Sequence, residues 1–177
     1  MKKVAVFGKP GGGKSTLSRK LSAATDIKLC PLDLIEYKQN GERVSAEQYA
    51  EAHAQWIDSD NWIIEGLGTL KSFWSRIDAA DTLIYVDLPY SVCYWWVTKR
   101  LLKSFFVKPE GWPEGCSVLK GTLAGWKYLR LSPKFWTPEL FKEIQVRGKG
   151  KELYRITSVK ELNNFVKKMG LSYSDPI

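Results

Sequence analysis

The stretch "GKPGGGKS", at residues 8–15, decides the fold of this chain. It matches the pattern G-x-x-x-x-G-K-[S/T] at every required position. A β-rich apolar run at 3–8 precedes it, and residues 14–24 have the apolar spacing of a helix. The alternative is a glycine-rich turn that binds nothing. A strand, a Lys-Ser pair and a helix in this order speak against that alternative.

The residue types of this loop suit a nucleoside triphosphate. Glycines let successive backbone N–H groups point at an anion without Cβ clashes, and the following helix adds its partly positive N-terminus. The Lys14 ammonium can reach the β- and γ-phosphates, the Ser15 hydroxyl can bind Mg²⁺, and Thr16 can contact the α-phosphate. We therefore expect ATP and Mg²⁺ as cofactors. The expected nucleotide-binding residues are Gly8, Gly11, Gly12, Gly13, Lys14, Ser15 and Thr16.

Strand and helix patterns alternate along the rest of the chain. Five strands separated by helices predict an α/β fold of the three-layer P-loop NTPase type, with a five-stranded parallel sheet covered on both faces. We expect one kinase-like domain that spans residues 1–177. The expected strands lie at 3–8, 26–33, 61–66, 81–87 and 152–157, and helices are expected at 14–24, 45–57, about 89–103 and after Ser158.

The net charge of +8 is concentrated in one segment. Residues 99–151 carry 12 Lys/Arg against 4 Asp/Glu, whereas 1–98 carry 11 against 12 and 152–177 carry 4 against 3. A basic segment with interleaved tryptophans suits phosphate-rich ligands, either a nucleotide or nucleic acid, and a solvated face without a ligand is the alternative. Within it, the Pro- and Gly-containing stretch 105–116 predicts a lid, flanked by basic residues over about 99–136.

Acidic residues follow three of the expected strands. Asp33, Glu65 and Asp87 stand at their carboxyl ends, where ligands bind in open parallel sheets. Such carboxylates can hold Mg²⁺ or orient an acceptor hydroxyl. We assign Asp33 to catalysis and acceptor binding, Glu65 to acceptor and metal binding together with Ser15, and Asp87 less firmly to either task. A carboxylate that caps a loop is the alternative for each.

Cationic side chains are expected around the transferred phosphoryl group. Arg76 is the candidate for binding an anionic group of the acceptor, and the alternative is that it forms an ion pair on the surface. Arg100, at the end of a helix before the lid, is the candidate for catalysis, and Lys108 and Arg130 are weaker ones. The neighbouring pair Trp95-Trp96 is expected in the core or in an interface.

Seen together, these residues resemble the adenylate-kinase-like P-loop kinases, and most closely the bacterial DNA topology modulation protein branch. The resemblance implies an acceptor-side segment after the second strand, an acceptor-side role for Asp33, and a Glu65-Gly66 pair near Mg²⁺. Two departures are lysines in place of many lid arginines, and "GLGT" after Glu65. The resemblance itself rests on the stretches "VFGKPGGGKSTLSRKL" (6–21), "LD" (32–33), "WIIEG" (62–66), "RIDAADTLIYVDLP" (76–89), "KRLL" (99–102), "EGC" (114–116) and "ITSVKELNNFV" (156–166).

Three functions remain open from the sequence. The first is a kinase that transfers the γ-phosphoryl of MgATP to a nucleotide, nucleoside or similar small acceptor. The second is a nucleic-acid-associated NTP-binding regulator, although no nucleic-acid-binding motif is visible. The third is a degenerate kinase that binds ATP without transfer. Three scattered cysteines and the lack of a long apolar run favour a cytoplasmic protein without a membrane partner; the oligomeric state is open.

Overall fold

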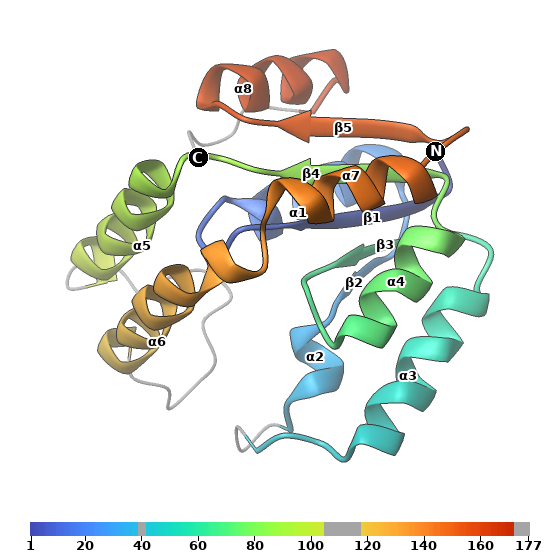
Figure 1. Ribbon diagram of the computed structural model, residues 1–177, viewed down its shortest axis with the longest axis horizontal. Helices are drawn as coiled ribbons and strands as arrows, with labels where there is room; N and C mark the ends of the chain where they lie inside the picture. Colours follow the sequence, from blue (N-terminus) through green and yellow to red (C-terminus); the bar gives the residue numbers. More distant parts are fainter. Residues whose placement is uncertain (39–41, 105–117, 172–177) are drawn as a thin grey trace.

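The computed structural model describes residues 1–38, 42–104 and 118–171, and a five-stranded parallel sheet forms its centre (Figure 1). The strand order is β2-β3-β1-β4-β5. Because every pairing is parallel, all five carboxyl ends lie at one edge of the sheet. The predicted α/β fold is therefore confirmed. The strands are β1 (Lys3–Gly8), β2 (Leu29–Pro31), β3 (Trp62–Glu65), β4 (Thr82–Val86) and β5 (Glu152–Ile156).

Helices cover both faces of the sheet. On one face, α1 and α8 contribute to a core cluster that α5 and α6 extend beyond the carboxyl edge; α3, α4 and α7 build a second cluster on the other face (Figure 1). The short helix α2 follows β2. The helices are α1 (Lys14–Thr25), α2 (Asp33–Glu36), α3 (Ala46–Asp58), α4 (Leu70–Ala79), α5 (Tyr90–Ser104), α6 (Val118–Leu131), the 3₁₀ turn η1 (Ser132–Lys134), α7 (Pro138–Arg147) and α8 (Val159–Lys168).

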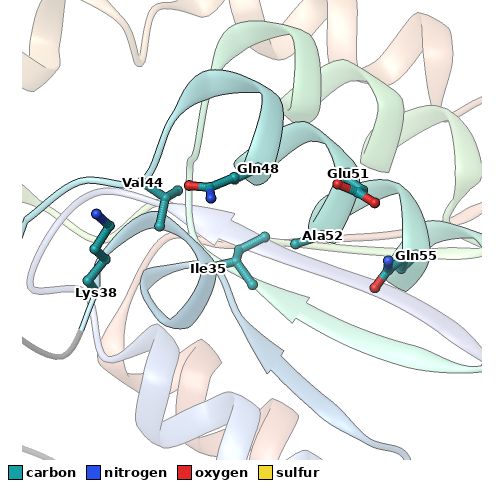
Figure 2. Close-up of a pocket in the computed structure, with 7 residues that line it drawn as sticks. All are labelled: Ile35, Lys38, Val44, Gln48, Glu51, Ala52 and Gln55. Carbon is teal, nitrogen blue, oxygen red and sulfur yellow. The ribbon is translucent and has the colours of Figure 1, made fainter.

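A surface hollow of about 500 Å³ lies between α2 and α3 (Figure 2). The α3 residues on its wall are spaced as one helix face, from Gln48 to Gln55, and Ile35 of α2 faces them. None of the residues assigned to the active site lines this hollow. Its lining is Ile35, Lys38, Val44, Gln48, Glu51, Ala52 and Gln55.

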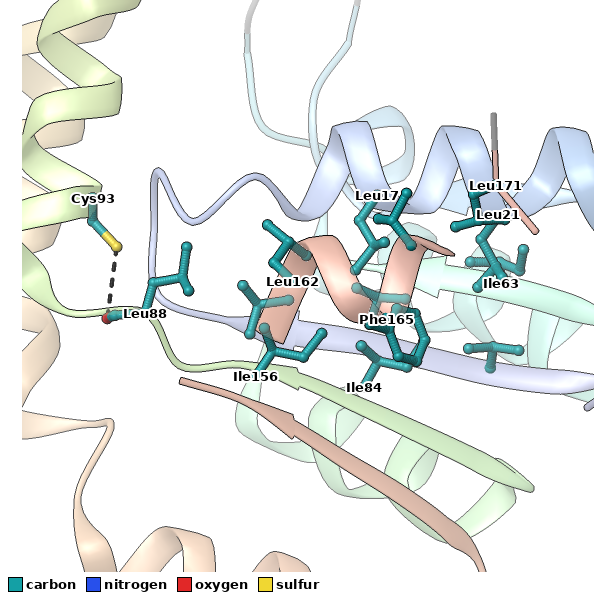
Figure 3. Close-up of a cluster of buried hydrophobic side chains, with 14 of the residues drawn as sticks. Leu17, Leu21, Ile63, Ile84, Leu88, Cys93, Ile156, Leu162, Phe165 and Leu171 are labelled. Atoms are coloured by element: carbon teal, nitrogen blue, oxygen red, sulfur yellow. Dashed lines mark hydrogen bonds between the residues drawn. The ribbon is translucent and has the colours of Figure 1, made fainter. Parts of the chain in front are cut away.

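The two cores follow from the period of a β-strand, in which successive side chains point to opposite faces. Val4 and Val6 of β1 belong to the cluster that Leu17 of α1 joins, whereas Ala5 and Phe7 belong to the cluster on the other face. Figure 3 shows the first cluster, with Leu17 and Leu21 of α1 above Ile84 of β4 and beside Leu162 and Phe165 of α8. This double cover fixes β1, and the loop at its end, in the middle of the molecule.

Several expectations require correction. The second strand covers only Leu29–Pro31, because Asp33 already begins α2. Trp95 is not a core residue, since it is 58% exposed, whereas Trp96 is partly buried against the first core cluster. The proposed lid at 105–116, including Lys108, lies outside the described residues. Within the described part of the chain, no helix has the length and apolar character needed to cross a membrane.

Candidate functional site

The glycine-rich loop between β1 and α1, residues 8–13, has backbone geometry that only glycines adopt easily. Gly8 has φ of +139°, and a Cβ there would collide with the carbonyl oxygen of Val86 on β4. Gly13, at the N-cap of α1, has the left-handed φ of 81°. The first turn of α1 has no acidic residue, so no negative side chain opposes an anion at its N-terminus. The chain thus forms the glycine-rich strand–loop–helix turn that the sequence predicts, here called the Walker loop; phosphate binding by this loop stays a prediction.

Lys14 is folded back onto the Walker loop. Its Nζ donates a hydrogen bond to the carbonyl oxygen of Lys9, at 2.8 Å, and the N–H of Gly12 donates to the same oxygen at 3.3 Å. Burial lowers the pKa of the Lys14 ammonium, while the nearby carboxylates of Glu65 and Asp33 act in the opposite direction. Lys14, Glu65 and Asp33, which the sequence assigns to one site, therefore lie within electrostatic range of one another.

Ser15 and Glu65, which the sequence predicts as metal ligands, lie side by side in the structure. The Ser15 hydroxyl donates to Glu65 Oε2 at 3.2 Å, although the two residues stand 50 positions apart in the chain. Neighbouring ligands of an octahedral Mg²⁺ with bonds of 2.0–2.1 Å lie about 3 Å apart, so these two oxygens suit one ion. Glu65 is 8% exposed, and burial, together with the charge of Asp33, raises the pKa of its carboxyl. Mg²⁺ would offset that cost by favouring the carboxylate form.

The other two strand-end carboxylates differ in their surroundings. Asp33 is exposed at the first position of α2, within electrostatic range of Lys14 and Glu65. Asp87 is instead held by cations on both sides: Lys9 Nζ lies 2.6 Å from Oδ1, and Arg155 Nη2 lies 2.6 Å from Oδ2. The less firm assignment of Asp87 to Mg²⁺ or acceptor therefore gives way to a structural one, because its oxygens already bind these cations.

Arg76 of α4 is only 1% exposed, so the surface ion pair considered for it is wrong. Its Nη2 donates to the carbonyl oxygens of Gly66 and Leu67, at 3.1 and 2.8 Å, and thereby holds the loop that follows Glu65. Its Nη1 is buried without a hydrogen-bond partner among the described residues. Burial lowers its pKa to about 10, still far above neutral pH, so Arg76 is a buried cation.

A buried polar cluster surrounds Arg76. The Tyr49 hydroxyl of α3 lies 2.9 Å from Ser72 Oγ of α4, and Tyr49 acts to raise the pKa of Arg76 against the larger effect of burial. His53, one helical turn from Tyr49, stacks on its ring with centroids 6.0 Å apart, and its Nε2 is buried without a partner among the described residues. Burial and the charge of Arg76 lower the pKa of His53 to about 4. This cluster couples α3 and α4 to the loop after β3.

The remaining cationic candidates lie on α5 and α6. Gly11 of the Walker loop packs against Cys93 and Val97 of α5, and Arg100 follows on the same helix face one turn beyond Val97. The Arg100 side chain is exposed there, and so is that of Arg130 on α6. Their part in transfer stays a prediction. Trp136 is a core residue, stacked on Tyr85 with ring centroids 5.3 Å apart.

Sequence reasoning missed Lys9 and Arg155. Lys9 occupies one of the variable positions of the glycine-rich pattern, so the motif assigns it no task. Arg155 lies on β5, 68 residues from Asp87, and no local pattern links the two. Only the parallel pairing of β4 with β5, which puts Val86 beside Ile156, brings these residues together.

The comparisons with known proteins support the fold. The chain is similar to a shikimate kinase from Acinetobacter baumannii, with a TM-score of 0.57 and 13% identity over 98% of this chain and 96% of that one. It is also similar to a gluconokinase from Sinorhizobium meliloti 1021, with a TM-score of 0.50 and 12% identity over 95% and 89% of the two chains. No protein-family model and no curated protein matches the chain. At such identities the likeness shows the P-loop kinase fold alone.

Proposed function

We propose that this protein is a small-molecule kinase that binds MgATP in the Walker loop and transfers the γ-phosphoryl group to a hydroxyl of a small acceptor. The observation that carries the proposal is the meeting of Lys14, Ser15 and Glu65 at one edge of the sheet, with Ser15 Oγ 3.2 Å from Glu65 Oε2. An ammonium beside a pair of hard oxygen ligands is what a triphosphate with Mg²⁺ requires.

The chain supplies a distinct group for each task of the transfer. The Walker loop N–H groups and Lys14 bind the phosphates, and Lys14, joined by Arg100, stabilises the charge that develops on the moving phosphoryl group. Ser15 and Glu65 hold Mg²⁺, which neutralises phosphate charge when bound. Asp33 orients the acceptor hydroxyl and takes its proton as the oxygen bonds to the γ-phosphorus. The bond from that phosphorus to the β-phosphate oxygen breaks, which leaves ADP and the phosphorylated acceptor.

The acceptor in this proposal is a small hydroxylated molecule with an anionic group. Arg76 supports the anionic group, because its guanidinium is buried and its Nη2 donates to carbonyl oxygens of Gly66 and Leu67, and a cation in such surroundings favours a negative ligand nearby. The exposed Asp33 leaves its carboxylate accessible to a hydroxyl. Shikimate, gluconate and nucleoside monophosphates all combine hydroxyls with an anionic group. The resemblance to the DNA topology modulation protein branch carries no acceptor of its own.

The decisive experiment measures ADP formation from MgATP with a panel of nucleoside monophosphates, nucleosides and small hydroxylated acids, including shikimate and gluconate. We expect one class to stimulate turnover. Lys14→Ala should lower the stimulated rate at least a hundredfold, since the charge on the transferred group loses its main protein partner, while circular dichroism reports an unchanged fold. Unchanged turnover in Lys14→Ala would contradict the Walker-loop mechanism.

Two other outcomes have defined meanings. MgATP binding without stimulated turnover by any acceptor would favour a degenerate kinase. Sequence-dependent nucleic-acid binding that survives physiological salt would favour a regulator, because contacts to phosphates alone weaken steeply as salt rises.

A further inference from the structure

The Lys9 ammonium lies beside the Walker loop but is turned away from it. Its Nζ lies 2.6 Å from Asp87 Oδ1, donates to the carbonyl oxygen of Leu88 at 3.0 Å, and lies 4.5 Å from the centroid of the Tyr90 ring. Lys9 is 9% exposed, and a charge so enclosed persists only with partners of this kind. Lys9 thus has all its donors directed to residues 87–90, and its side chain is not available as a second phosphate ligand.

Asp87 is in turn fixed from the other side. Its Oδ2 accepts from Arg155 Nε at 2.9 Å and Nη2 at 2.6 Å, and its backbone N–H donates to the carbonyl oxygen of Ile156 at 2.8 Å. The guanidinium of Arg155 also lies 4.2 Å from the centroid of the Phe141 ring on α7. The three charged residues therefore link the ends of β1, β4 and β5. We call Lys9, Asp87 and Arg155 the clamp.

The backbone of Lys9 determines the shape of the Walker loop. Its N–H donates to Val86 O at 3.3 Å, and its carbonyl oxygen accepts from both Gly12 N–H and Lys14 Nζ. Because both the side chain and the backbone N–H of Lys9 are held by these contacts, its carbonyl oxygen stays in one position. The first turn of the loop is then fixed at that carbonyl, and Lys14 has a defined resting place before a phosphate displaces it.

We propose that the clamp preorganises the Walker loop and that Lys9 is a positioning residue for triphosphate binding. The inference rests on the proposed MgATP-binding function. A loop that is already ordered does not have to lose conformational entropy when the ligand arrives, and this raises its affinity. The clamp combines two cations with one carboxylate, so it also leaves a net positive charge beside the phosphates.

The test is isothermal titration calorimetry of the full chain with MgATP and, separately, with inorganic tripolyphosphate, which has no base or sugar. Lys9→Met removes the ammonium and keeps the apolar stem, and Asp87 retains Arg155. We expect the Kd of both ligands to rise about tenfold. A change of this size matches the conformational entropy lost when about one backbone residue is ordered on binding. Lys9→Arg, which keeps the charge and can reach Asp87, should bind within about threefold of the parent chain. Arg147→Met is the matched control, because it breaks the Arg147–Asp78 pair of 2.8 Å on α7 and α4.

Each outcome separates the two proposals. If the parent chain binds MgATP and Lys9→Met binds it equally well, the clamp is overturned while the proposed function stands. A loss that Lys9→Arg fails to restore, or that Arg147→Met reproduces, also overturns the clamp. If the parent chain binds neither ligand, both proposals fall. If Lys9→Met does not fold, Arg155→Met is the second test, because the Arg155 side chain is 42% exposed. We expect Arg155→Met to bind both ligands about threefold more weakly. Unchanged binding by this variant would overturn the clamp.

Discussion

Burial acts in opposite directions on the charged residues of this site. It lowers the pKa of the Lys14 ammonium and raises the pKa of the Glu65 carboxyl, because in each case it disfavours the charged form. Each of the two charges favours the other, and the Ser15 hydroxyl adds a hydrogen bond to the carboxylate. Burial still outweighs this mutual stabilisation at both residues. Under the proposed function, the phosphates of ATP would add counter-charge at Lys14 and Mg²⁺ would add it at Glu65.

Asp33 allows acceptor use to be tested separately from ATP binding. We expect Asp33→Asn to lower kcat/KM for the acceptor by about a hundredfold or more, the usual loss for a general base, because the amide cannot take the hydroxyl proton. The Kd for MgATP should stay within about threefold of the parent value. Coupled-assay kinetics and calorimetry measure the two quantities.

Glu36→Gln is the matched control for Asp33→Asn. Glu36 ends the same short helix, and its carboxylate pairs with Arg43 at 3.1 Å. This control should leave kcat/KM near the parent value. An equal loss of acceptor use and MgATP affinity in Asp33→Asn would instead indicate a structural role for Asp33.

At the scale of elements, α4 connects the core to the loop after Glu65. Its first turn follows the N-cap residue Thr69, whose Oγ1 accepts a hydrogen bond from Ser72 N–H at 3.2 Å. Its last turn contains Arg76, which donates hydrogen bonds to the carbonyl oxygens of Gly66 and Leu67. The helix therefore fixes both ends of the turn that follows β3. A change at its cap should reach the acceptor side of the site.

Thr69→Ala and Thr137→Ala test this connection as a pair. Both threonines cap a helix of ten residues through an Oγ1 that accepts an N–H at 3.2 Å, one on α4 and the other on α7. Each substitution should lower the free energy of unfolding by about 1 kcal/mol, measured by urea denaturation. Only Thr69→Ala should also raise the acceptor KM, by about threefold or more. An equal KM effect from Thr137→Ala would show that lowered stability alone is responsible.

For the whole molecule, the buried polar cluster between α3 and α4 links folding to pH. The pKa of His53 is about 4 in the folded chain, against an ordinary value of 6.5. Above pH 6.5 the imidazole is neutral in both states and has no effect. Between 6.5 and 4 the unfolded chain binds the proton and the folded chain does not, so stability falls as the pH falls.

We expect this one histidine to contribute a loss of about 2 kcal/mol between pH 7 and pH 5. His53→Phe keeps an aromatic ring beside Tyr49 and cannot be protonated, so its urea midpoint should depend less on pH over this interval. His53→Gln provides a second variant without titration. A midpoint with the same pH dependence in all three chains would show that other groups cause the acid sensitivity.

Much of this architecture could be read from local patterns. The strand at 3–8, the glycine-rich loop after it and the helix expected at 45–57, observed at Ala46–Asp58, were predicted at or within one residue of their positions, because each depends on neighbouring residues. The helices α4, α6 and α7 were not predicted individually. In α6, Gly121 and Gly125 weaken the helical signal, and its fold comes from packing against α5.

The sequence by itself determined the parallel α/β fold, the glycine-rich loop after the first strand and the strand-end acids, since residue type and short spacing carry that information. Only the tertiary structure decided which of those acids meet the loop. Glu65 contacts Ser15 because β3 lies beside β1. Asp87 instead forms ion pairs with Lys9 and Arg155, because β4 lies between β1 and β5. Strand order sets these contacts, and strand order depends on how whole helices bury their apolar faces, which no local stretch specifies.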